Sequence, residues 1–162
     1  MSGSKRGLYL LAGLPIAAAL AAGAYWNRGT NADTAIRDPV DPQLLREGAE
    51  VYAQNCASCH GADLKGEPDW QSANPDETLK APPHDETGHT WHHADELLFE
   101  ITKYGTAKAI GLENFNSNMP AFEGTLSDAE IIAVLAWIKD QWPENIRAQH
   151  DMVNRKSADP RS

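Results

Sequence analysis

The residues best suited to chemistry lie together at positions 56–60, in the run Cys-Ala-Ser-Cys-His. Two thiols with two residues between them, those of Cys56 and Cys59, can reach the two vinyl groups of one haem and form thioether bonds. The imidazole of His60, which follows directly, can then face the iron. The motif C-x-x-C-H therefore predicts one covalently attached haem c, with His60 as the proximal iron ligand.

Other uses of a cysteine pair fit this sequence less well. The chain has only two cysteines, so a zinc site built from two C-x-x-C pairs would lack half of its ligands. A thioredoxin-like redox pair follows a buried strand of a βαβ unit. Here a helical pattern precedes Cys56, and no strand rich in valine and isoleucine is present.

An iron bound by His60 alone would keep one open face, and methionine is a common second ligand. The chain has three methionines. Met1 starts the chain and Met152 lies in a polar stretch, whereas Met119 follows an irregular segment and precedes Pro120. Methionine is more often a core residue than a ligand, so these observations alone leave the role of Met119 open.

Four further histidines lie between the haem motif and the next predicted helix, at His84, His89, His92 and His93. Imidazoles so close in sequence could bind copper or zinc, which would suit a copper-handling accessory protein. The alternative is a solvated loop, because glycine, proline and acidic residues interrupt the stretch. His92 or His93 could also replace Met119 on the iron, although both lie just before a helix start.

Helices must position these groups. Asp41 and Pro42 start a helix with apolar residues at helical spacing, on which Gly48 would allow close approach of a second helix. A middle helix over 95–104 ends at Gly105. Ser127 and Glu130 form a capping box for a last apolar helix, which Pro143 stops. The predicted fold is all-α, with three helices around the haem.

The flanking segments predict a tethered domain. Basic residues precede an uncharged run over 7–26, which is long enough to span a membrane, although a signal peptide remains the alternative. Residues 27–41 read as a linker, 42–147 as the haem domain and 148–162 as a poorly ordered polar tail. Because positive residues stay inside, we expect a single-pass inner-membrane protein whose haem domain faces the periplasm.

The net charge of −9 argues against nucleic acid as a partner and predicts a redox partner with a basic docking face. No motif indicates a small-molecule substrate.

Three motifs around C-x-x-C-H make the sequence resemble the class I cytochrome c family from about residue 43 to 142. Gly48, Val51 and Tyr52 occupy the positions that precede the motif in GAEVYAQNCASCHG. Asn118-Met119-Pro120 is similar to the family's distal loop. The run LSDAEIIAVLAWI is similar to its last helix, with Trp137 at the aromatic position.

The resemblance implies Met119 as the distal iron ligand and a backbone carbonyl near Pro82 as the partner of the second His60 nitrogen. It also implies an electron carrier rather than an enzyme, which relays electrons between respiratory membrane complexes and does no chemistry on a substrate. A haem subunit of a dehydrogenase is an alternative that the sequence leaves open.

Overall fold

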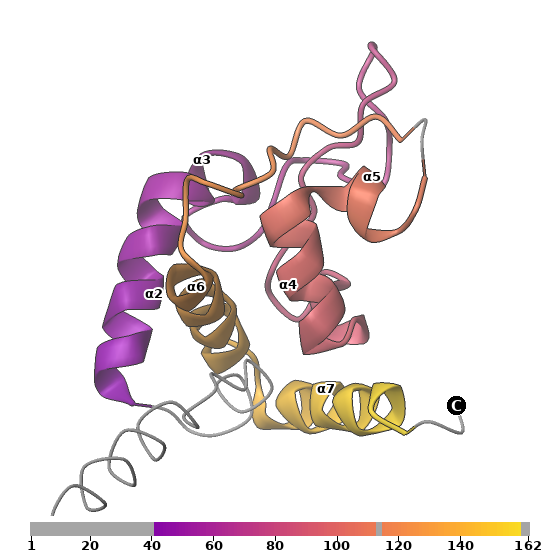
Figure 1. Ribbon diagram of the computed structural model, residues 1–162. Coiled ribbons are helices and arrows are strands. Elements are labelled where there is room, and N and C mark those ends of the chain that lie inside the picture. Colours follow the sequence, from indigo (N-terminus) through magenta and orange to yellow (C-terminus); the bar gives the residue numbers. More distant parts are fainter. Residues whose placement is uncertain (1–40, 113–114, 160–162) are drawn as a thin grey trace, which may run out of the picture. The chain divides into compact units, whose positions relative to one another are not determined.

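The computed structural model describes residues 41–112 and 115–159, and the described part contains helices but no strand. Its elements are α2 (Pro42–Asn55), α3 (Ala57–His60), the 3-10 turn η2 (Thr90–His92), α4 (Asp95–Tyr104), α5 (Thr106–Ala109), α6 (Asp128–Asp140) and α7 (Glu144–Ser157) (Figure 1). This confirms the all-α prediction for these residues. None of the described helices is long and apolar enough to cross a membrane, and the span predicted over 7–26 lies outside them.

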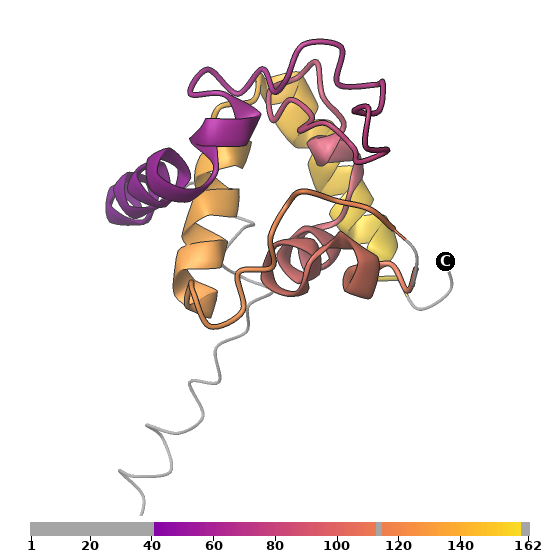
Figure 2. The same ribbon diagram turned by 90° about the horizontal axis from the view of Figure 1, so that it is seen from above.

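Helices α2 and α6 pack closely against each other (Figures 1 and 2). Their closest approach is at Gly48, where an added β-carbon would overlap the carbonyl oxygen of Ala133 on α6. Only glycine allows the two backbones to lie so near, which confirms the prediction for this residue. The core around the contact is apolar and consists of Val51, Tyr52, Leu64, Val134, Ile138, Trp142 and Ile146.

The helices α2, α4 and α6 begin or end at the capping residues that the sequence predicts. The side chain of Asp41 accepts a hydrogen bond from the Gln43 N–H at 2.8 Å at the start of α2. Ser127 and Glu130 form both halves of the predicted capping box on α6. Helix α4 ends at Gly105, whose φ of 85° is readily adopted by glycine.

Helix α7 corrects the predicted tail. Residues 148–157 do not form a poorly ordered stretch but continue a helix of 14 residues, so a fourth long helix joins the three predicted ones. Besides Ile146, two polar side chains of this helix are buried, His150 and Asn154. Asn154 accepts the N–H of Asp95, the first residue of α4, and His150 Nε2 lies 3.1 Å from the carbonyl oxygen of His93, two residues earlier. These contacts hold a polar helix in a defined place in the fold.

The segment between α3 and α4, residues 61–94, has little regular structure and is held by backbone hydrogen bonds. The Glu67 N–H donates to the Ala81 carbonyl at 2.9 Å, and the His84 N–H donates to the Leu64 carbonyl at 2.7 Å. Gly66 lies between them, and a β-carbon there would come within 2.5 Å of the Ala81 oxygen. This folding back brings residues 81–84 next to the Cys-His motif.

Candidate haem-attachment site

The two cysteines lie on one helical turn. Cys56 ends α2 through a 2.9 Å bond from its N–H to the Tyr52 carbonyl, and its own carbonyl accepts the N–H of His60 at 3.0 Å. Both thiols are free, with Cys59 exposed and Cys56 partly buried. Burial, with a smaller contribution from Cys59, raises the pKa of Cys56 to about 11. The pair is therefore positioned as two thiols next to His60.

His60 is oriented by the segment that folds back over it. Its Nδ1 lies 2.9 Å from the carbonyl oxygen of Pro82. A carbonyl only accepts, so Nδ1 carries the proton and Nε2 keeps its lone pair. Burial lowers the pKa of His60, which favours the neutral ring that a metal requires. The contact with Pro82 is the one that the family resemblance implies.

Met119 lies in the connection between α5 and α6, drawn in orange in Figures 1 and 2. It is partly buried, and its N–H donates to the Ser117 hydroxyl at 3.1 Å. Next to it, the Asn118 amide donates to the Thr78 hydroxyl at 2.8 Å, which ties this loop to the segment that carries Pro82. Met152, in contrast, is 55% exposed on α7.

Comparison with known proteins shows the family to which the chain belongs. Residues 43–138 match the model of the family described as cytochrome c oxidase, cbb3-type, subunit III. The match covers more than half of the chain and includes the Cys-His motif and Met119. The chain is a class I c-type cytochrome.

Two kinds of curated relatives match the cytochrome. Cytochrome c6 of Picosynechococcus sp. (strain ATCC 27264 / PCC 7002 / PR-6) is 35% identical over 98 residues, which is 60% of this chain and 74% of that protein. The cbb3-type cytochrome c oxidase subunit FixP of Rhizobium meliloti (strain 1021) is 50% identical over 36 residues, 22% of this chain. That alignment covers only 12% of the FixP subunit. No solved structure matches the chain.

Membership in the family makes covalently attached haem c the cofactor of the cytochrome, and the residues present fit it. Two free thiols and an imidazole with an unprotonated Nε2 lie within five consecutive residues. This donor set is the one that thioether formation and iron ligation need. A thioredoxin-like arrangement has no support, because the described residues contain no strand for a βαβ unit.

The histidines of the histidine-rich stretch make separate ring contacts, one of which joins His89 and His93 with ring centroids 5.5 Å apart. His84 stacks on His60, His89 on Trp70 with ring centroids 5.2 Å apart, and His92 on Trp91 at 3.6 Å. The part of the chain that the structure describes contains no group of three or more histidine, cysteine or acidic side chains arranged to hold a metal. Sequence reasoning missed the His84 contact, because no local signal links residue 84 to residue 60.

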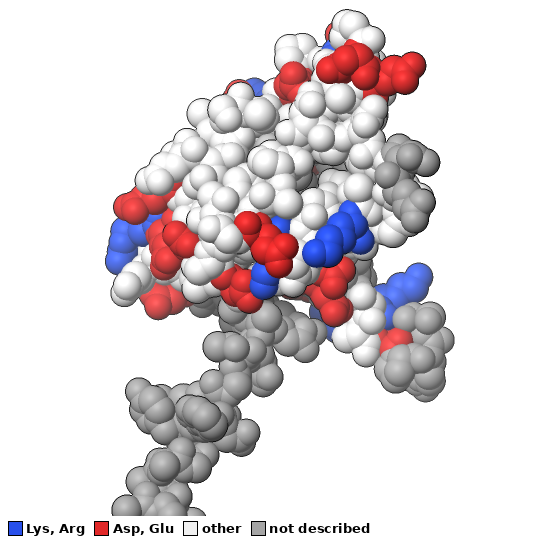
Figure 3. All heavy atoms as spheres, turned by 45° about the horizontal axis from the view of Figure 1, so that its top comes forward, with Lys and Arg blue, Asp and Glu red and all other residues white. Residues whose placement is uncertain are grey.

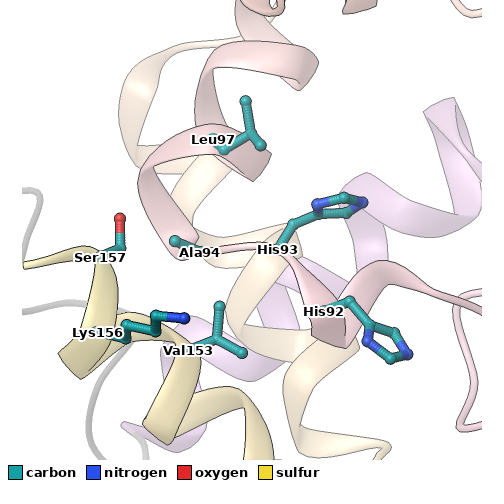
Figure 4. A pocket seen from close by; sticks show the side chains of 7 residues that line it. All are labelled: His92, His93, Ala94, Leu97, Val153, Lys156 and Ser157. Carbon is teal, nitrogen blue, oxygen red and sulfur yellow. The ribbon is translucent and has the colours of Figure 1, made fainter. Parts of the chain in front are cut away.

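A hollow of about 430 Å³ lies between the start of α4 and α7, and no residue of the Cys-His motif lines it (Figure 4). His92 and His93 line it, together with Ala94, Leu97, Val153, Lys156 and Ser157. The rings of the two histidines point to different sides in Figure 4. The hollow therefore does not bring them together as a pair of ligands.

Proposed function

We propose that this cytochrome is an electron carrier whose haem c is attached through Cys56 and Cys59, with His60 and Met119 as the axial iron ligands. It relays electrons between respiratory membrane complexes, tethered by its N-terminal segment to the periplasmic side of the inner membrane. The observation that carries the proposal is the His60–Pro82 contact of 2.9 Å, directly beside two free thiols. Haem c, when bound, supplies the change of oxidation state.

The surroundings of His60 support its assignment as the proximal ligand. The Pro82 carbonyl holds one ring nitrogen, so the other is free to bind and the ring cannot turn away. Tyr52 stabilises the turn that follows His60, because its O–H donates to the Gly61 carbonyl at 2.9 Å. Burial keeps water from the ring, since His60 is 6% exposed.

Met119 is the preferred distal ligand, because it is the more buried of the two methionines in the described ranges and its loop is tied to the Pro82 segment through Asn118 and Thr78. A histidine and methionine pair fills both axial positions and raises the reduction potential. With no open position for a substrate, the protein transfers electrons and is not an enzyme.

The surface suits a basic partner. The whole chain has a net charge of −9, which steers it towards positive surfaces. On the face seen in Figure 3, a broad uncharged area lies between acidic side chains at the upper tip and charged residues along the lower edge. The FixP relatives are subunits of cbb3-type cytochrome c oxidases, which supports a respiratory complex as the partner.

Haem attachment is tested by replacing Cys56 or Cys59 with Ala and extracting the protein with acidified organic solvent. We expect wild-type haem to stay with the protein and haem to be released from, or absent in, either variant. Free release from the wild type would contradict the attachment.

The distal ligand is tested by Met119→Ala, with Met152→Ala as the matched control. In the oxidised wild type, we expect the weak long-wavelength absorption of an iron–methionine bond. Met119→Ala should lose that band, lower the potential and allow the reduced protein to bind carbon monoxide, whereas Met152→Ala should change none of these. A Met119→Ala variant that keeps the band and excludes carbon monoxide would place the ligand elsewhere.

The membrane tether is tested by fractionation of the full chain. About 20 apolar residues are not released by charge screening, so the protein should stay in the membrane fraction after a high-salt wash. Recovery in the soluble fraction would instead favour cleavage of a signal peptide.

A further inference from the structure

A second histidine lies against the proposed proximal ligand. The rings of His60 and His84 stack with their centroids 4.0 Å apart and their planes inclined by 23°. His84 comes from the segment that folds back over the motif, two residues after Pro82, which binds the edge of the same His60 ring. One face and one edge of His60 are thus covered by residues of a single short segment.

The fold holds His84 in this place from several directions. Its N–H donates to the Leu64 carbonyl at 2.7 Å, and its carbonyl accepts the indole N–H of Trp142 at 2.7 Å. Its ring Nδ1 lies 2.8 Å from the Thr90 hydroxyl, and the ring of Tyr52 meets it edge-on at 6.2 Å. A ring bonded in this way cannot turn freely, so it presents a fixed flat surface to His60.

The stacking distance excludes His84 as a ligand on the opposite side of the same iron. Metal–imidazole bonds of about 2 Å would place two opposite rings with their centroids roughly 6 Å apart. The observed 4.0 Å instead places the two rings in direct face-to-face contact, with no room for an iron between them. His84 therefore acts on the ligand and not on the iron.

We propose that His84 is a positioning residue for the proximal haem ligand, which fixes the rotation of the His60 ring about its bond to iron and keeps water from its face. The proposal rests on the proposed function, in which His60 binds the iron of haem c. The Pro82 carbonyl alone holds one atom of the ring, whereas the stacked His84 ring defines the plane. A ligand held at a single orientation gives one defined electronic state of the haem.

The experiment compares His84→Ala, His84→Phe and His92→Ala in the haem-loaded full-length protein. His92→Ala is the matched control, because it removes a histidine that stacks on Trp91 and not on His60. The first measurement is the proton NMR spectrum of the oxidised protein, in which the haem methyl shifts report the plane of the axial imidazole. The second is the midpoint potential from a redox titration.

We expect His84→Ala to move the haem methyl shifts and to lower the potential, since water then reaches the proximal side and stabilises the more positive oxidised haem. His84→Phe restores a flat ring and should return the methyl shifts towards the wild-type pattern. His92→Ala should leave both measurements unchanged. Unchanged shifts in His84→Ala, failure of Phe to restore them, or an equal change in His92→Ala would each overturn the proposal.

If the His84→Ala variant does not incorporate haem, Thr90→Val provides a second test of the proposal. It keeps the His84 side chain but removes the 2.8 Å bond that fixes the orientation of its ring, so we expect a smaller movement of the same methyl shifts. No movement would again overturn the proposal. A wild type without covalent haem would instead contradict the proposed function, which separates the two failures.

Discussion

Two contacts between helices in this cytochrome are built in opposite ways. Helix α2 meets α6 through backbone and apolar side chains, with Gly48 against Ala133 and no room for an added methyl group. Helix α7 meets the start of α4 through buried polar groups, with Asn154 hydrogen-bonded to Asp95 and His150 Nε2 3.1 Å from the His93 carbonyl oxygen. The first contact depends on volume and the second on hydrogen bonding. The two should therefore fail under different perturbations.

The largest effect is expected from Gly48→Leu. A side chain at this position overlaps the α6 backbone, which cannot withdraw without opening the apolar core, so we expect a loss of about 3 kcal/mol or more in the free energy of unfolding. The measurement is denaturant unfolding of the haem-loaded protein. Ala53→Leu is the matched control, because residue 53 is exposed on the same helix. Equal stability of the two variants would show that the helices can separate.

A smaller loss is expected from Asn154→Ala. The Asn154 side chain accepts the Asp95 N–H at 2.8 Å and donates to the Asp95 carboxylate at 2.9 Å. Its removal leaves partly buried polar groups without partners, which costs about 1–3 kcal/mol. Met152→Ala, on the exposed side of α7, should change the unfolding free energy little. A neutral Asn154→Ala would mean that α7 is held by other contacts.

The smallest expected effect is a pH dependence of the unfolding free energy that arises from His150 in the α7 contact. Burial lowers the pKa of His150, so the unfolded chain binds a proton at higher pH than the folded one does. Stability should therefore fall as the pH drops below the ordinary histidine value of about 6.5. His150→Gln removes this group, and its unfolding free energy should change less steeply between neutral and acidic pH. Parallel pH profiles of His150→Gln and the wild type would contradict the assignment.

Local signals in the sequence were sufficient to predict where several helices begin and end. Asp41 and Pro42 start α2, the Ser127–Glu130 box starts α6 and Gly105 ends α4, as predicted. Each of these depends on residues a few positions apart. The prediction for α7 was wrong because its composition is polar. Its buried residues are Ile146, His150 and Asn154, and one apolar residue among them does not form an apolar stripe that the sequence would reveal.

The sequence by itself determined the chemistry of this protein, because two thiols and an imidazole at C-x-x-C-H spacing are placed by a single helical turn. Only the tertiary structure decided what surrounds that imidazole. His84 reaches His60 because residues 61–94 fold back through hydrogen bonds such as the 2.7 Å contact of its N–H with Leu64. The same holds for α7, where Asn154 bonds to Asp95 across 59 positions of sequence. Such contacts depend on the path of the chain in space, and nothing in the local spacing of residues encodes them.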